Sequence, residues 1–164
     1  MILYLRMMEM ALITVGRTDA GWVKEGLDMY VSRLGRYIQF SMLEIPYLKK
    51  SQSIPHDKVK EMEGELILKA IKPSDEVVLL DERGRGLRSV ELASFLGGRM
   101  ASSVKRLVFV IGGAYGFSGA VYSRADSMLS LSNMTFPHQL VRVLFAEQLY
   151  RAFTILKGEP YHHE

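Results

Sequence analysis

Hydrophobic residues along the chain fall into two alternating patterns: short continuous apolar runs, and longer stretches in which apolar residues recur every three or four positions. The short runs predict buried strands, because a strand needs only about five residues whereas a helix needs about ten or more. The run that stops at Pro46 is expected near an edge of the sheet, where proline is tolerated. The predicted strands cover residues 10–16, 38–45, 76–81, 106–111 and 128–132.

The stretches with helical spacing predict amphipathic helices, each with one apolar stripe that faces a core. In the first of them, apolar residues from Trp22 to Leu34 form this stripe, and Thr18 or Asp19 is the expected N-cap. Strands that alternate with helices predict an α/β fold with a largely parallel sheet covered by helices on both faces. The predicted helices cover residues 18–35, 57–71, 89–104 and 138–157.

The length of 164 residues and the hydrophobic content of 48% are ordinary for a single globular domain that spans the whole chain, residues 1–164. Methionines crowd the start, at Met7, Met8 and Met10. We therefore interpret residues 1–10 as a disordered or misassigned leader without a role of its own.

Composition excludes several classes of protein. The chain has no cysteine, which excludes disulfides, thiolate metal sites and cysteine nucleophiles. No apolar run approaches the roughly 20 residues that span a bilayer, and residues 1–17 lack the features of a cleaved signal, so we expect a cytoplasmic protein. Because the net charge is only +3, contact with a nucleic acid would need local clusters of Arg and Lys, or a surface doubled by dimerisation.

Three of the predicted strands end in unusual segments, at residues 81–87, 112–118 and 132–137. Ligands of open α/β sheets bind outside the carboxyl ends of the strands, so these three segments are expected to meet in one site. The glycines at 112, 113 and 116 would allow close backbone approach to a ligand, although a plain tight turn is the alternative. Their spacing matches neither the dinucleotide fingerprint nor a phosphate loop.

Charged residues in two other places are candidates for function. Arg83, Arg85 and Arg88 follow the strand at 76–81, and they either bind phosphate or carboxylate oxygens or form a solvated basic loop. The predicted helix at 138–157 carries further functional groups among its apolar residues, which cover more than one stripe and indicate burial on two sides. These groups are His138, Arg142, Glu147, Tyr150 and Arg151.

Within that helix, His138 and Arg142 share a face, and Glu147 and Arg151 stand four residues apart, which also fits an ordinary helix ion pair. The chain closes with Pro-Tyr-His-His-Glu, in which Tyr161 and His162 either lie across a site and move protons near neutral pH or belong to an expression scar. A metal site there has no supporting ligands, and we expect none.

Several motifs, in this order, carry a resemblance to a known family: Leu80-Asp81, Ile111-Gly112-Gly113, then residues 130–138, and finally Tyr161-His162. The densest part comprises residues 131–142 and 146–152. From Ala11 onward the chain closely resembles the SPOUT-class methyltransferases that modify a pseudouridine of large-subunit ribosomal RNA, the RlmH family.

The resemblance implies a trefoil-knotted α/β fold, in which the last segment threads a loop, and a homodimer with its cofactor sites at the subunit interface. It also implies S-adenosylmethionine as the methyl donor. The family's cofactor residues correspond to the three strand ends described above. They are Leu80, Gly112, Leu131, Ser132, Asn133, Met134, Thr135 and Phe136.

The reaction that the resemblance implies is methylation at N3 of a pseudouridine, with the assembled ribosome or its large subunit as the expected substrate. We interpret His138 or His162 as the proton-handling group, Arg142 and Arg151 as ligands of a phosphate or of the imide oxygen, and Tyr161 as a stacking partner of the base. Glu147 is expected to orient Arg151. The alternatives are an RNA-binding protein of the same fold without chemistry, and an α/β enzyme that uses another nucleotide.

Overall fold

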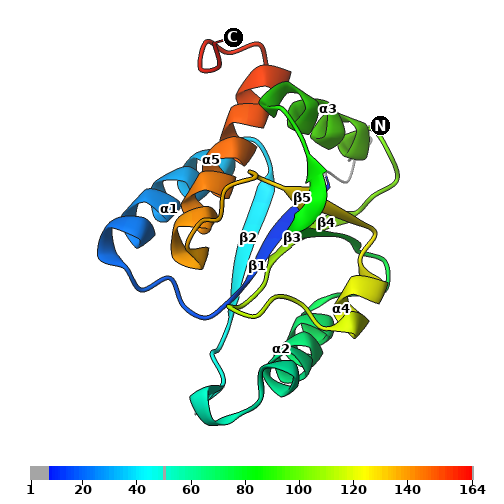
Figure 1. The fold of residues 1–164 in the computed structure, drawn as a ribbon. Coiled ribbons are helices and arrows are strands. Elements are labelled where there is room, and N and C mark those ends of the chain that lie inside the picture. Colours follow the sequence, from blue (N-terminus) through cyan, green and yellow to red (C-terminus); the bar gives the residue numbers. More distant parts are fainter. Residues whose placement is uncertain (1–7, 50, 164) are drawn as a thin grey trace.

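A computed structural model describes residues 8–49 and 51–163 of the chain (Figure 1). Its strands are β1 (Glu9–Val15), β2 (Gln39–Ile45), β3 (Glu76–Gly86), β4 (Arg106–Ile111) and β5 (Ser127–Ser130). Its helices are α1 (Gly21–Leu34), α2 (His56–Ala70), α3 (Ser89–Met100), α4 (Gly119–Arg124) and α5 (His138–Leu156), with a short 3₁₀ turn at Ser51–Ser53. The predicted alternation of strands and helices is confirmed.

The strands form one sheet in the order β2-β1-β4-β3-β5, and every neighbouring pair is parallel. The strand that stops at Pro46 is β2, and it lies at an edge as predicted. β4 and β5 lie on opposite sides of β3. The carboxyl end of β3 is therefore flanked by the carboxyl ends of the other two.

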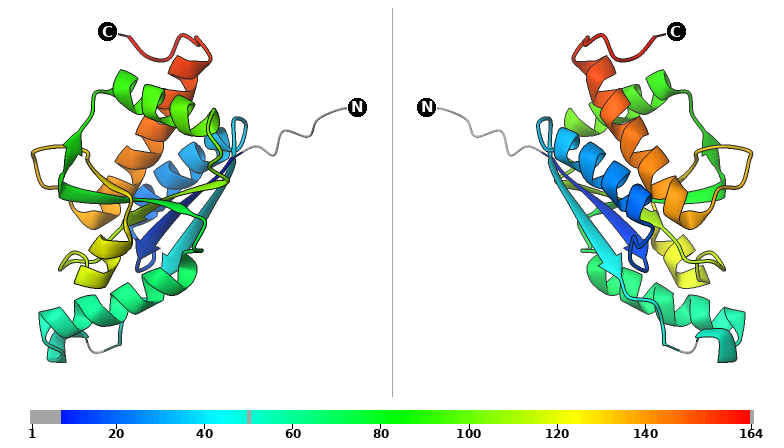
Figure 2. Two further views of the ribbon diagram at one scale, coloured as in Figure 1. Left: turned by 90° about the vertical axis from the view of Figure 1, so that its right-hand side faces the viewer. Right: turned by 90° about the vertical axis from the view of Figure 1, so that its left-hand side faces the viewer.

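Helices cover both faces of the sheet, and the strands contribute side chains to a hydrophobic core on each face. On β4, Leu107, Phe109 and Ile111 point into one core, and Val108 and Val110 point into the other, because successive side chains of a strand alternate between faces. α1, α3 and α5 cover the first face, and α2 and α4 cover the second (Figures 1 and 2). The predicted parallel sheet with helices on both faces is confirmed.

The first helix starts later than its spacing predicts. α1 begins at Gly21, its N-cap is Ala20, and Trp22 is 68% exposed rather than part of the core stripe. The reason lies in the preceding segment: the backbone N–H of Thr18 donates to Glu44, and that of Asp19 donates to Gln139. These tertiary bonds hold residues 16–20 as a loop and leave Val23, Leu27 and Leu34 as the buried stripe.

The segment at 81–87, predicted as a loop, is mostly strand. β3 continues to Gly86 and pairs with β5 a second time, after a register shift between Leu80 and Arg85. Gly84 makes this possible, since a Cβ there would lie 2.6 Å from the backbone of Leu129. The hydrophobic pattern ends at Asp81 because the second half of β3 no longer crosses the core.

Part of the predicted leader belongs to the domain. β1 begins at Glu9, and Met8 and Met10 are 5% and 1% exposed in the core. The interpretation of residues 8–10 as a leader is therefore wrong. Residues 1–7 lie outside the described residues.

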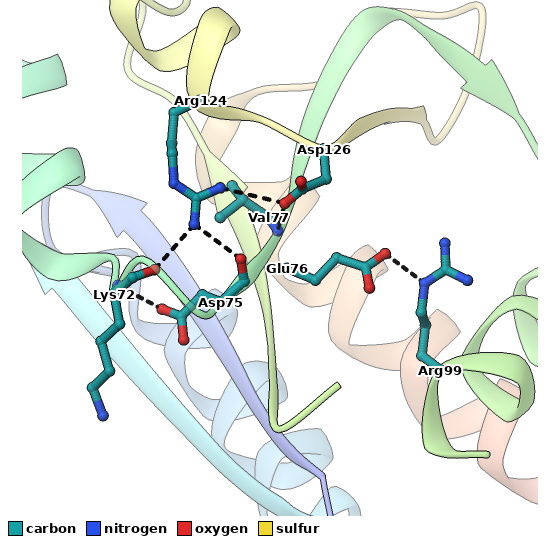
Figure 3. A network of polar contacts seen from close by, with 7 residues as sticks. All are labelled: Lys72, Asp75, Glu76, Val77, Arg99, Arg124 and Asp126. Carbon is teal, nitrogen blue, oxygen red and sulfur yellow. Dashed lines mark hydrogen bonds and ion pairs between the residues drawn. The ribbon is translucent and has the colours of Figure 1, made fainter. Parts of the chain in front are cut away.

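Polar groups hold the amino end of β3 and its neighbours (Figure 3). The carboxylate of Asp75 accepts from the backbone N–H of Lys72 (2.8 Å) and from Arg106 (2.9 Å). Arg124 donates to the carbonyls of Lys72 and Asp75, at 3.0 and 2.9 Å. Asp126 accepts from the backbone N–H of Val77 at 2.7 Å. The sheet is thus anchored at the amino end of β3, opposite the predicted site.

Candidate active site

The three strand ends expected to meet do lie together. Leu80 of β3 is the register partner of Ile111 on β4 and of Leu129 on β5. Adjacent strands are about 4.8 Å apart, so the bulge after Leu80 lies beside the segments that follow Ile111 and Leu129.

Two adjoining cavities open between these segments. One, of about 180 Å³, is lined by Leu80, Ile111 and the loop from Leu129 to Phe136. The other, of about 420 Å³, is lined by Leu80, Phe136 and the turn at 112–117. Both share Leu80, Asp81, Glu82, Ile111 and Phe136 as walls. The expected cofactor residues therefore border one continuous region.

The glycine segment after β4 forms a closed turn. The N–H of Gly116 donates to the carbonyl of Gly113 at 3.2 Å, and Gly116 has a φ of 83°. This φ favours glycine, because a side chain there would meet the backbone. The turn is closed by its own hydrogen bond and also lines the cavity of about 420 Å³, so the two alternatives, a plain turn and a ligand-binding turn, both stay open.

The loop after β5 presents polar backbone and exposed side chains. The hydroxyl of Ser130 donates to the carbonyl of Ser132 (3.1 Å), and that of Ser132 accepts from the N–H of Met134 (2.9 Å). Asn133, Met134 and Thr135 are exposed, Met134 by 71%. These bonds fix the path of the loop and leave Met134 over the mouth of the smaller cavity.

The residues present suit an adenosine-containing cofactor. The walls of the smaller cavity are mainly apolar side chains, which suit the faces of a purine, and the loop at 131–136 brings peptide N–H and C=O groups that suit its edge. The apolar walls are Leu80, Ile111, Leu129, Leu131, Phe136 and Val141.

A third cavity, of about 200 Å³, joins this loop to α5. It is lined by Leu131, Phe136 and Glu147 among others. A larger cavity of about 650 Å³ lies between α3 and the β3–β5 pair, and it is bordered by Arg85 but by none of the expected cofactor residues. We therefore place the candidate site at the strand ends, although the cavity beneath α3 is larger.

His138 lies where the loop enters α5. Its Nε2 is 2.6 Å from the hydroxyl of Tyr47, which follows β2. Burial, together with the nearby charge of Arg142, lowers the pKa of His138 below its ordinary value of 6.5. This shift favours the neutral imidazole, whose Nε2 is hydrogen-bonded to the Tyr47 hydroxyl. Tyr47 had no sequence signal, since it occupies a polar stretch after a proline.

Arg142 occupies a different place from the one expected. Its residue is fully buried, and its guanidinium donates to the carbonyls of Val15 (2.7 Å) and Gly16 (2.9 Å) and to the hydroxyl of Thr18 (2.9 Å). A guanidinium enclosed in this way is not available to an RNA phosphate or to an imide oxygen. Arg142 instead joins the start of α5 to the loop after β1.

Glu147, Arg151, Tyr161 and His162 form one cluster near the end of the chain. Arg151 donates to Glu147 at 2.5 Å and lies 3.3 Å from Nδ1 of His162. The Tyr161 hydroxyl donates to Glu147 at 3.1 Å, and its ring lies under the Arg151 guanidinium. The hydrogen bond to Glu147 raises the pKa of Arg151, and burial raises that of Tyr161. The structure thus brings these four residues together.

This terminal cluster and the cofactor residues belong to different parts of one chain. α5 has 19 residues, so its two ends are about 28 Å apart at about 1.5 Å per residue. The loop at 131–136 precedes the first end, and Tyr161 and His162 follow the second (Figure 1). Only Glu147 borders a cavity shared with the loop.

The three arginines that follow Leu80, namely Arg83, Arg85 and Arg88, lie in different places. Arg83 borders the larger site cavity and lies over the ring of Tyr122, 5.2 Å from its centroid. Tyr122 donates to Asp81, and burial with this bond raises the pKa of Tyr122 to about 12. Arg85 borders the cavity beneath α3 instead. Arg88 borders a further cavity of about 250 Å³ together with Leu131, Ser132 and Asn133. Arg83 and Arg88 therefore each line a cavity of the strand-end site, and Arg85 does not.

Comparison with known proteins identifies the class. The model of a family described as predicted SPOUT methyltransferases matches residues 8–162. The chain therefore belongs to the SPOUT methyltransferase family, and the resemblance found in the sequence is confirmed.

Three similar relatives all have the same name. Proteins from Parabacteroides distasonis and Flavobacterium johnsoniae are 51% and 48% identical over 157 residues, which cover 96% of this chain and 100% of each relative. A protein from Christiangramia forsetii is 51% identical over 156 residues, 95% of this chain and 99% of its own. All three are named ribosomal RNA large subunit methyltransferase H.

A solved structure supports the fold alone. A probable methylase family protein from Haemophilus influenzae Rd KW20 superposes with a TM-score of 0.52 at 13% identity, covering 94% of this chain and 68% of the other. The predicted threading of the last segment through a loop stays a prediction.

In residues 8–49 and 51–163, no helix has the length and apolarity of a membrane span, and no group of three acidic or histidine side chains is placed to hold a metal ion.

Proposed function

We propose that this protein transfers a methyl group from S-adenosylmethionine to N3 of a pseudouridine in large-subunit ribosomal RNA. Family membership and the names of its relatives support the reaction class and the kind of RNA. The observation that carries the proposal is the meeting of three strand ends around adjoining cavities, with Leu80, Gly112 and the loop at 131–136 as walls.

The cofactor residues act mainly through their backbone. Leu80 and Phe136 would enclose the adenine, while the peptide groups of residues 131–136 bind its edge and Gly112 permits close approach. When bound, the cofactor supplies an electrophilic methyl carbon. The rigid sheet then holds the site in alignment, and alignment alone removes much of an activation barrier.

Proton transfer falls to groups around this region. N3 of the base is an imide nitrogen that loses its proton as it attacks, and a positioned base contributes roughly 10²–10⁴-fold. His138, neutral and close to the loop, and His162, in the terminal cluster, are the two candidates. Arg151 would stabilise the negative charge on the imide oxygen, Glu147 orients Arg151, and Tyr161 stacks on the base.

The chain is proposed to act as a homodimer with its cofactor sites at the subunit interface, as its resemblance to the family implies. Within one copy, Tyr161 and Arg151 bond to Glu147, which borders a cavity together with Leu131 and Phe136 of the cofactor loop. A second copy that packs against this helix would bring its terminal cluster to the first copy's cofactor loop.

The substrate is proposed to be the assembled large subunit or ribosome. With a net charge of +3, one chain has little electrostatic attraction for naked RNA, so shape must supply recognition. A cytoplasmic location follows from this substrate.

The experiment is tritiated methyl transfer from S-adenosylmethionine to ribosomes, isolated subunits and free RNA from a strain that lacks the protein. We expect transfer to ribosomes or large subunits, its loss by at least about 100-fold in Arg151→Ala, and full activity in the exposed control Arg36→Ala. Absence of transfer to every substrate by the wild-type protein would contradict the proposal.

A further inference from the structure

Glu63 is a buried acid that no step of the proposed reaction uses. It lies on α2 and is 5% exposed, whereas Glu61 and Glu65 on the same helix are exposed. Its Oε2 has no hydrogen-bond partner among the described residues. A buried carboxyl without a partner is costly, and its presence calls for a reason.

The carboxyl of Glu63 lies against the glycine turn of the candidate site. A Cβ placed on Gly113 would be 2.6 Å from Oε2 and 3.0 Å from Oε1, so only glycine fits beside it. The next residue of the helix, Gly64, packs closely on Ser118, because a Cβ on Gly64 would lie 2.4 Å from the Ser118 hydroxyl oxygen. α2 is therefore seated directly on the segment at 113–118.

The turn that Glu63 contacts is also a wall of the cavity taken as the cofactor region. The N–H of Gly116 closes the turn on the carbonyl of Gly113, and both residues line the cavity of about 420 Å³ together with Leu80 and Phe136. Lys60 of α2 borders the same cavity, so helix and turn meet at its wall. In Figures 1 and 2, α2 and α4 lie together on the side of the sheet away from α5.

The surroundings favour the uncharged form of this carboxyl. Burial raises the pKa of Glu63 above its ordinary value of 4.5, and no other cause contributes among the described residues. The Lys60 ammonium, one turn away on α2, is paired with Asp57 at 3.1 Å. On the elements packed against α2, the charged or titratable side chains are Glu44 of β2 and Tyr122 and Arg124 of α4, and Tyr115 lies in the turn itself.

We propose that Glu63 is a positioning residue for the cofactor: its buried carboxyl packs on Gly113 and holds the turn at 113–116 in the shape that cofactor binding requires. This inference rests on the proposed function, because it takes the cavity in front of the turn as the cofactor site. Glu63 touches neither cofactor nor RNA and acts through Gly113.

Ionisation of Glu63 would then weaken cofactor binding. A carboxylate needs water or a cation, and it gains either only by moving away from Gly113 and releasing the turn. Because the folded-state pKa is raised, this contribution is complete at low pH and is lost as pH rises through that value. Cofactor affinity should fall in the same direction, by at most about tenfold per pH unit.

The test is calorimetric titration of the full-length protein with S-adenosylhomocysteine between pH 5.5 and 9, using wild type, Glu63→Gln and Glu65→Gln. We expect Glu63→Gln, which stays neutral, to bind with an affinity nearly independent of pH over the range in which wild type weakens. Glu65→Gln, with its exposed side chain, should follow wild type. All three share any titration of the ligand itself, so the difference isolates Glu63.

Parallel pH profiles for wild type and Glu63→Gln would overturn the inference. If Glu63→Gln does not fold, a ¹³C NMR titration of the wild-type Glu63 carboxyl decides instead: we expect it to be neutral at pH 7, with the amide shifts of Gly113 and Gly116 following its titration. A carboxyl charged at pH 7, or amides that do not respond, would contradict it. Absence of binding by wild type at every pH refutes the proposed cofactor, and the coupled titration then tests the turn separately.

Discussion

The two ends of β3 differ in how their polar groups are used. At the amino end, Asp75 pairs with Arg106. Arg124 and Asp126 bind backbone groups around Val77 (Figure 3). At the carboxyl end, the strand bulges after Leu80 and faces loops with an exposed Met134. One end is closed by its own side chains, and the other borders the cavities proposed for the cofactor. In this proposal, stability and binding are separated along one strand.

The carboxyl end nevertheless has one anchor of the amino-end type. Arg142 is buried and donates to carbonyls of the loop after β1, while Gln139 donates to the carbonyl of Arg17. The loop at 131–137 is therefore exposed in its middle, where only its own hydrogen bonds shape it, and is held to the rest of the domain where it enters α5. The comparison predicts different outcomes for substitutions at the two ends.

The largest effect is expected at the amino end, from Arg106→Met. The side chain of Asp75 is 1% exposed, and removal of its partner leaves a buried charge, which costs about 3–5 kcal/mol of unfolding free energy. Cofactor affinity of the folded protein should not change. Urea denaturation and calorimetry measure the two quantities, with exposed Arg36→Met as the control, and a loss under about 1 kcal/mol would break the comparison.

Arg142→Met should affect both properties. It leaves buried carbonyls of Val15 and Gly16 without their donor, which costs about 3 kcal/mol, and it releases the start of α5, so cofactor affinity should fall as well. Arg142→Lys should recover only part of the stability, because an ammonium lacks the planar fork. A variant of normal stability that fails only in methyl transfer would show that Arg142 acts on the RNA after all.

Gly84→Ala tests the bulge itself. The added Cβ meets the backbone of Leu129, and such overpacking costs about 1–3 kcal/mol. Because β5 leads into the cofactor loop, the affinity for S-adenosylhomocysteine should fall too. Gly86→Ala, where nothing lies within 4 Å of the new Cβ, is the matched control and should retain affinity.

The smallest effect concerns pH and His138. Its folded-state pKa is lowered by burial, so its contribution to stability is present above the ordinary value and is lost as pH falls through that range. His138→Gln should therefore lose less stability than wild type between pH 7 and 5. Equal losses in thermal or urea denaturation would indicate a solvated imidazole.

Much of the architecture was predictable because buried positions carry apolar residues at the regular spacing of a strand or a helix. The apolar run at 106–111 and the stripe of α5 gave their elements within one residue. The second half of β3 was not predictable, since Glu82 to Gly86 lack apolar alternation and only Arg85 and Gly86 pair with β5. The loop before α1 was missed for a similar reason, because bonds to Glu44 and Gln139 hold it.

The candidate site was predictable in its location but not in its roles. Parallel strands bring their carboxyl ends together, so the meeting of Leu80, Gly112 and the loop at 131–136 followed from order alone. The enclosure of Arg142 did not, because its partners are carbonyls more than 120 residues away along the chain. Glu63 gave no signal at all, since a buried acid on an amphipathic helix reads like its exposed neighbours.

The central claim is that the three strand ends form the cofactor site. Its most direct test is NMR titration of the backbone amides with S-adenosylhomocysteine. The account predicts that the perturbed amides gather in residues 80–82, 111–116 and 131–136, with those near Asp75 and Val77 unchanged. Perturbations centred on the cavity beneath α3, or none at saturating ligand, would contradict it.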